Sequence, residues 1–80
     1  MTLTILLFGI TTDLLGASSV TITLKPDTTV GNFKSLLLKE YPELHKIKSY
    51  AIAVNETYAA DETILKPNDV VAIIPPVSGG

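Results

Sequence analysis

The residues of this chain most suited to taking part in a chemical reaction are the last two, Gly79 and Gly80. Glycine has no Cβ, so a Gly-Gly pair can pass through a channel that would exclude any larger residue. The Gly80 carboxylate would then stand at the tip of an unhindered segment, where another protein can activate it. Frayed chain ends also often consist of small residues, so the pair gains weight only if the preceding residues build a fold that presents it.

The residues just before the glycines predict such a presentation. Pro75 and Pro76 have no N–H to donate to a sheet, and they hold the backbone extended. They are expected to end the structure that precedes them. We therefore predict a folded domain over residues 1–76 and a flexible tail over residues 77–80, Val77-Ser78-Gly79-Gly80.

The composition excludes several classes of protein. Eighty residues make one domain with a modest core. Six lysines, no arginine and eight acidic residues give a net charge of -2, which argues against nucleic-acid binding. Without cysteine there is no disulfide, thiolate metal site or persulfide on this chain. No apolar run reaches the roughly 20 residues of a membrane span, and no basic N-terminal region suggests a signal peptide, so we expect no membrane association and a cytoplasmic location.

Side-chain catalysis is not predicted. The sequence has no nucleophile–base set, no glycine-rich phosphate loop and no metal-ligand spacing. His45, in a polar connection predicted over residues 43–48, has no second ligand or paired acid nearby and is interpreted as a surface residue. Asp61-Glu62 is interpreted as a solvated turn. The chemistry therefore rests with the Gly80 carboxylate, which becomes reactive as a mixed anhydride with AMP and can then be converted by sulfur to a thiocarboxylate.

The first strand, predicted over residues 2–10, has two unequal faces. Its odd positions are apolar and are expected to face the core: Leu3, Ile5 and Leu7. Its even positions begin as threonines but end as Leu6 and Phe8, on the face expected to meet water. Either another element covers these two side chains or they form a docking patch, and the strand alone leaves both open.

Two helical segments are predicted. The first is a short turn, with Thr11 or Thr12 as its cap and Gly16 at its left-handed end. The second follows Thr29, a good N-cap, and ends at Pro42. Its apolar stripe has helical spacing and is interpreted as core: Val30, Phe33, Leu37 and Tyr41.

The remaining strands complete a sheet. Residues 20–25 alternate and are predicted to pair antiparallel with the first strand. Residues 50–54 form a third strand and residues 57–59 a short edge strand. Residues 70–74 are almost entirely apolar, which is typical of a strand that is buried on both faces or central in a sheet. We place this last strand beside the first, in an α+β domain with four to five strands and one main helix on one face.

These elements resemble the ubiquitin-like β-grasp fold, and within it the family of molybdopterin synthase small subunits, over essentially all eighty residues. The most specific stretch is residues 69–80, DVVAIIPPVSGG. Its double proline is typically absent from the similar thiamine-pathway carriers, and Ser78 stands where ubiquitin-type modifiers typically have arginine. Less specific matches are the first strand leading to Leu14-Leu15-Gly16, the helix start Thr29-Val30, and Ala53-Val54-Asn55.

The resemblance implies that an E1-like adenylyltransferase uses ATP to activate Gly80 and that a sulfur donor protein converts it to a thiocarboxylate. The tail then enters the large molybdopterin synthase subunit, where the sulfur passes to the pterin precursor. The chain itself is expected to bind no cofactor and no metal. The family's partner-binding residues map onto the following positions: Phe8, Tyr58, Ile74, Pro75, Pro76, Val77 and Ser78.

Two departures from the family pattern bear on partner contacts: Asn68-Asp69 stands where Gly-Asp is common, and Tyr58 where an aliphatic residue is common. Other functions remain open on the sequence. The same activated tail would serve a sulfur carrier of the thiamine or tRNA-thiolation pathways, or a ubiquitin-like modifier. A β-grasp interaction module with an inert tail is the alternative from a different class.

Overall fold

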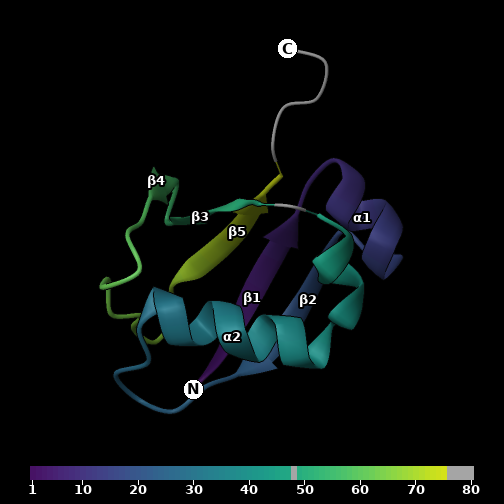
Figure 1. Ribbon diagram of the computed structural model, residues 1–80. Coiled ribbons are helices and arrows are strands. Elements are labelled where there is room, and N and C mark those ends of the chain that lie inside the picture. The colour runs from purple at the N-terminus through teal and green to yellow at the C-terminus, as the bar shows by residue number, and fades with distance from the viewer. Residues whose placement is uncertain (48, 76–80) are drawn as a thin grey trace.

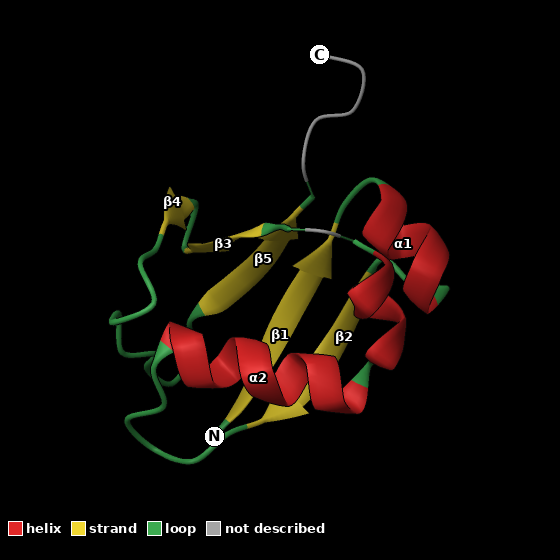
Figure 2. Ribbon diagram, viewed as in Figure 1, coloured by secondary structure: helices red, strands yellow, loops and turns green. Residues whose placement is uncertain are grey.

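A computed structural model describes residues 1–47 and 49–75 and has two layers, a sheet and a main helix (Figure 1). The helix α2 crosses one face of a five-stranded sheet, as the colouring by secondary structure makes plain (Figure 2). The elements in chain order are β1 (Thr2–Leu7), α1 (Ile10–Leu15), β2 (Ser19–Thr23), α2 (Val30–Glu40), the 3-10 helix η1 (Pro42–Lys46), β3 (Ala51–Val54), β4 (Thr57–Tyr58) and β5 (Val70–Ile74).

The sheet has the strand order β2-β1-β5-β3-β4. β1 pairs antiparallel with β2 and parallel with β5, with Ile5 opposite Val71. β3 pairs antiparallel with β5 and with β4. The predicted antiparallel first pair, the central last strand and the short edge strand are therefore confirmed. Parallel neighbours need a long crossover connection, and here the chain from β2 to β4 supplies it.

The core lies between α2 and the sheet. The odd positions of β1 are buried, as predicted, and so are the core positions of the α2 stripe, with Tyr41 packed at the margin. Burial of apolar surface is the main favourable term in folding, so the contacts between α2 and the sheet contribute most of the free energy that stabilises the domain. The side chains with no exposed surface at all include Ile5, Val30, Phe33, Leu37, Leu44, Val71 and Ile73.

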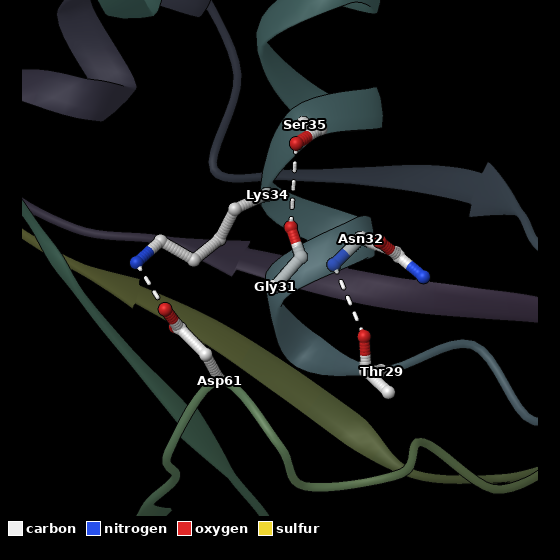
Figure 3. Close-up of polar contacts among 6 residues, drawn as sticks. All are labelled: Thr29, Gly31, Asn32, Lys34, Ser35 and Asp61. Atoms are coloured by element: carbon white, nitrogen blue, oxygen red, sulfur yellow. Dashed lines mark hydrogen bonds and ion pairs between the residues drawn. The ribbon is translucent and has the colours of Figure 1, made fainter.

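The first turn of α2 is closed by side-chain and loop oxygens, of which Figure 3 shows the Thr29 hydroxyl. The Thr29 hydroxyl accepts a hydrogen bond from the Asn32 N–H at 3.2 Å, which confirms the predicted N-cap. The Val30 N–H donates to the Thr63 carbonyl at 2.8 Å. Helix starts leave such N–H groups without intrahelical partners, so the loop of residues 61–63 completes the helix.

Gly31 explains how this loop comes so close to the helix. Its N–H donates to the Asp61 carbonyl at 3.0 Å, and a Cβ on Gly31 would lie 3.4 Å from that same oxygen. The Lys34 ammonium reaches the Asp61 carboxylate at 3.3 Å (Figure 3). Glycine weakens a helix by about 1 kcal/mol relative to alanine. At this position the loss is offset by the hydrogen bond to the Asp61 carbonyl, which the absence of a Cβ allows.

The start of α1 corrects two sequence predictions. β1 ends at Leu7 rather than Ile10, and α1 begins at Ile10 after Gly9, with no capping hydrogen bond from Thr11 or Thr12. The Thr11 hydroxyl instead accepts from the Phe8 N–H at 2.9 Å and donates to the Phe8 carbonyl. Threonine hydroxyls bond local backbone groups in several patterns, and here they tie the helix back to the end of β1. The left-handed Gly16 at the helix end is confirmed, with φ 66°.

The connection after α2 is the other correction. Residues 43–48 were expected to be a polar link, but η1 turns Leu44 inward until none of its surface is exposed. His45 is exposed, as predicted.

We expect Leu44→Ala to lower the free energy of unfolding by about 2–5 kcal/mol, the range for truncating a fully buried leucine. Urea denaturation followed by circular dichroism would measure it. Leu36→Ala is the matched control, because Leu36 on α2 is exposed. Equal losses in the two variants would contradict the burial of Leu44.

Candidate functional site

The face of the sheet that α2 leaves uncovered is apolar. In β5, Val71 and Ile73 point into the core, whereas Val70, Ala72 and Ile74 point to the opposite side. Val70 is 42% exposed and the other two are half-buried. Of the two alternatives for this apolar strand, burial on both faces and a central place in the sheet, the structure therefore shows the second. A single helix covers a single face, and the second face stays apolar without a cover among the described residues.

This face is hollowed. An open depression of about 610 Å³ lies over β5 and the ends of β1, β3 and β4. Nine residues line it, seven of them apolar: Leu6, Phe8, Ala53, Tyr58, Val70, Ala72 and Ile74, with Asn55 and Glu56 as the polar members. We call this surface the apolar hollow.

The structure brings together the three residues mapped as the docking face. Phe8, Tyr58 and Ile74 all line the apolar hollow. Phe8 is 47% exposed and Tyr58 is 72% exposed, so the question of whether another element covers Phe8 is answered for the described residues: none does. Exposed apolar patches rimmed by polar residues mark interaction sites, which favours the docking interpretation of Leu6 and Phe8.

One edge of the hollow is held by a network around Asn55. Its side-chain oxygen accepts from the Val70 N–H at 3.0 Å, and its amide donates to the Asp69 carboxylate at 2.9 Å. The other Asp69 oxygen accepts from the Lys66 N–H at 2.8 Å. Asn68 takes the left-handed conformation expected of it, with φ 70°. Asn68 therefore forms the turn although glycine is common at this position, and Asp69 links that turn to Asn55 in the β3–β4 hairpin.

The base of the tail rests on a residue that the sequence did not single out. Gly9 has φ 56° and ψ −133°, a conformation open essentially only to glycine. A Cβ there would lie 3.1 Å from Cγ of Pro75, the residue that follows β5. A glycine directly after a strand, before a short helix, was the available signal. The predictions for Pro76, Val77, Ser78, Gly79 and Gly80 lie outside the described residues.

The opposite layer carries a second, more polar hollow between α2 and the segment before β3, of about 550 Å³. Burial raises the pKa of Tyr50 there, and the Lys34 ammonium lies 5.9 Å from its ring centroid. Across residues 1–47 and 49–75, no three His, Cys, Asp or Glu side chains gather as a metal site would require. No helix in the same residues is long and apolar enough to span a membrane.

Comparison with known proteins adds sequence relatives. A family model described as the ThiS family matches residues 5–80. The molybdopterin synthase sulfur carrier subunit of Arabidopsis thaliana is 34% identical over 77 residues, which cover 95% of this chain and 80% of that protein. The protein of the same name from Dictyostelium discoideum is 38% identical over 80 residues, covering 95% and 93%.

Solved structures show the same fold. The small archaeal modifier protein SAMP1 of Haloferax volcanii superposes with a TM-score of 0.87 at 25% identity, over all of both chains. A chain from the Helicobacter pylori complex of subunits 1 and 2 of the molybdopterin-converting factor does so with a TM-score of 0.70 at 26% identity, again over all of both chains. The predicted β-grasp fold is confirmed.

We expect Gly9→Ala to destabilise the domain more than Gly16→Ala. Both glycines have positive φ, but a Cβ on Gly16 would meet nothing within 4 Å, whereas one on Gly9 would crowd Pro75. A left-handed alanine costs about 1–2 kcal/mol, which is the expected loss for Gly16→Ala in urea unfolding. A Gly9→Ala loss no larger than this would contradict the Gly9–Pro75 contact.

Proposed function

This chain belongs to the ThiS family, and from this we propose that it is the sulfur carrier and small subunit of a molybdopterin synthase, acting in molybdenum cofactor biosynthesis. Relatives named molybdopterin synthase sulfur carrier subunit match 95% of the chain. The observation that carries the proposal is the apolar hollow, which lies beside the base of the Gly-Gly tail. A carrier needs both features, a face to be gripped and an end to be activated.

The proposed chemistry uses the main chain alone. An E1-like adenylyltransferase joins the Gly80 carboxylate to AMP from ATP, which gives a mixed anhydride and releases pyrophosphate. Sulfur that a donor protein delivers at the oxidation level of hydrosulfide attacks the carbonyl carbon. The C–O bond to AMP then breaks, AMP and a proton leave, and Gly80 ends as a thiocarboxylate. The large synthase subunit then positions the pterin precursor to receive this sulfur. The chain binds no cofactor of its own in this scheme, and ATP belongs to the activating enzyme.

The folded body determines where the tail begins. β5 is hydrogen-bonded on both sides, to β1 and β3, and so is held more firmly than an edge strand. Pro75 continues directly from it and rests against Gly9. The five residues after Pro75 can reach at most about 17 Å when extended. In a partner bound to the hollow, the site that acts on Gly80 would therefore have to lie within about 17 Å of Pro75.

The proposed partners follow from the same geometry. The Helicobacter pylori relative is seen in a complex of subunits 1 and 2, which supports a large subunit as the partner. The exposed apolar side chains of the hollow support that surface as the place where it docks. The adenylyltransferase and the sulfur donor protein are the further partners of the scheme. The cytoplasmic location remains a prediction from the sequence.

A second candidate function is that of a protein modifier. The likeness to SAMP1 from Haloferax volcanii, at 25% identity, extends over the whole chain. In that case the activated Gly80 would form an amide with a lysine of a target protein instead of accepting sulfur. Detection of such conjugates, with no gain of sulfur, would favour this candidate over the carrier.

We expect the intact mass of the chain to rise by the difference between a sulfur and an oxygen atom after incubation with its activating enzyme, ATP and a sulfur donor. Deleting Gly80, or adding one residue after it, should abolish this gain, because the reacting carboxylate is displaced. Circular dichroism should show both variants folded. Sulfur gain by either variant would contradict the role of Gly80.

We expect Phe8→Asp to weaken binding to the large synthase subunit by tenfold or more, since a buried interface aromatic commonly contributes over 1.4 kcal/mol. The melting temperature should change little, because Phe8 is half exposed in the free domain. Calorimetric titration measures the affinity and a thermal scan the stability. A large fall in melting temperature would instead show that Phe8 is a core residue.

A further inference from the structure

Glu56 occupies a backbone conformation that its side chain does not explain. It follows Asn55 in the two-residue turn between β3 and β4, and its φ is 71°. Turns with two positive φ values favour Asn-Gly. The chain has three other described non-glycine residues with positive φ, and all are the types that tolerate it: Asp27, Asn55 and Asn68. Glutamate is the exception, and unusual backbone conformations concentrate at functional sites.

Among the described residues that line the apolar hollow, Glu56 is also the only one with an acidic or basic side chain of the Asp, Glu, Lys, Arg or His type. Within residues 1–47 and 49–75, its carboxylate has no hydrogen bond and no ion pair. The nearby polar groups are already committed: the Asn55 amide and both Asp69 oxygens are used in the network that joins the hairpin to β5. As far as residues 1–47 and 49–75 go, the hollow therefore presents the unpaired carboxylate of Glu56 at the edge of an apolar surface.

The turn that carries Glu56 is held in place before any partner arrives. The Asn55 N–H donates to the Val70 carbonyl at 2.8 Å, and the Val70 N–H donates back to the Asn55 side chain. Ala53 pairs with Tyr58 across the hairpin. A charge on such a preorganised turn loses less conformational entropy on binding than one on a free loop.

We propose that Glu56 is a specificity-determining residue that selects the large synthase subunit by pairing with a lysine or arginine at the edge of the surface that covers the hollow. This inference rests on the proposed function. Apolar contacts supply affinity but discriminate weakly among apolar partners, whereas a charge at the rim orients the partner and disfavours those that present an acid. In this proposal the carboxylate of Glu56 gives the residue its role at the turn, although glutamate does not favour the positive φ there.

The test measures the affinity and association rate of the full chain with the large synthase subunit of the same organism. Glu56→Gln removes the charge and keeps the shape. Glu56→Gly removes the charge and relieves the positive φ. Asp27→Gly is the matched control, since it removes one negative charge and one positive φ at an exposed residue that does not line the hollow.

At about 0.1 M salt, we expect both Glu56 variants to bind about threefold to tenfold more weakly than the parent chain, mainly through slower association. The gap should narrow at about 1 M salt, where the Debye length falls to about 3 Å. Glu56→Gly should melt at a higher temperature than the parent chain yet bind no better than Glu56→Gln. Asp27→Gly should bind as the parent does.

Parent-like affinity of Glu56→Gln at about 0.1 M salt would overturn the inference and leave the proposed function standing. A loss in Asp27→Gly equal to that in Glu56→Gln would also overturn it, because the effect would then be one of net charge. If the parent chain bound no large subunit and gained no sulfur, the proposed function would fail and the inference with it.

Discussion

The parallel pairing of β1 with β5 is the constraint on which the rest of this structure depends. Leu7 lies opposite Ile73 in that ladder. Parallel strands end at the same edge of a sheet, so Phe8, just after β1, and Ile74, the last residue of β5, lie at the same end of the domain. Gly9 and Pro75 then meet one position further on. An antiparallel pairing would have placed the docking aromatic and the tail base at opposite ends of the domain.

The size of the chain decides what the other face of the sheet does. A domain of eighty residues buries a smaller fraction of its surface than a large one. In this domain the main helix, α2, covers one face of the sheet. The second face keeps apolar side chains that would gain free energy by leaving water. A partner that covers them gains that free energy without any rearrangement of the core, because Val71 and Ile73 on the same strand are already buried.

Local patterns in the sequence were sufficient for the five strands, the two α-helices and most of the core, but not for the 3-10 helix η1 or the boundary between β1 and α1. Alternation predicted the faces of β1, helical spacing predicted the buried side of α2, and the apolar run of β5 predicted its central place. An apolar run does not say whether its outer face is covered by the same chain or by another, so the hollow required the structure. Leu44 was missed because its sequence neighbours are polar, and Gly9 because its role depends on a contact with Pro75, far along the chain.

The division of labour in the proposed carrier explains why a search for catalytic side chains finds none. The reacting atoms belong to the main chain at Gly80, which offers a partner no shape or charge by which to tell one carrier from another. Discrimination must then come from the folded body, and the apolar part of the hollow is poorly suited to it because apolar surfaces accept one another broadly. The informative residues are those at its rim whose presence the fold does not require. Asn55 and Asp69 are accounted for by the bonds they make to β5 and its preceding turn. Glu56 makes no such bond among the described residues, and its carboxylate is therefore the group that we propose selects the partner.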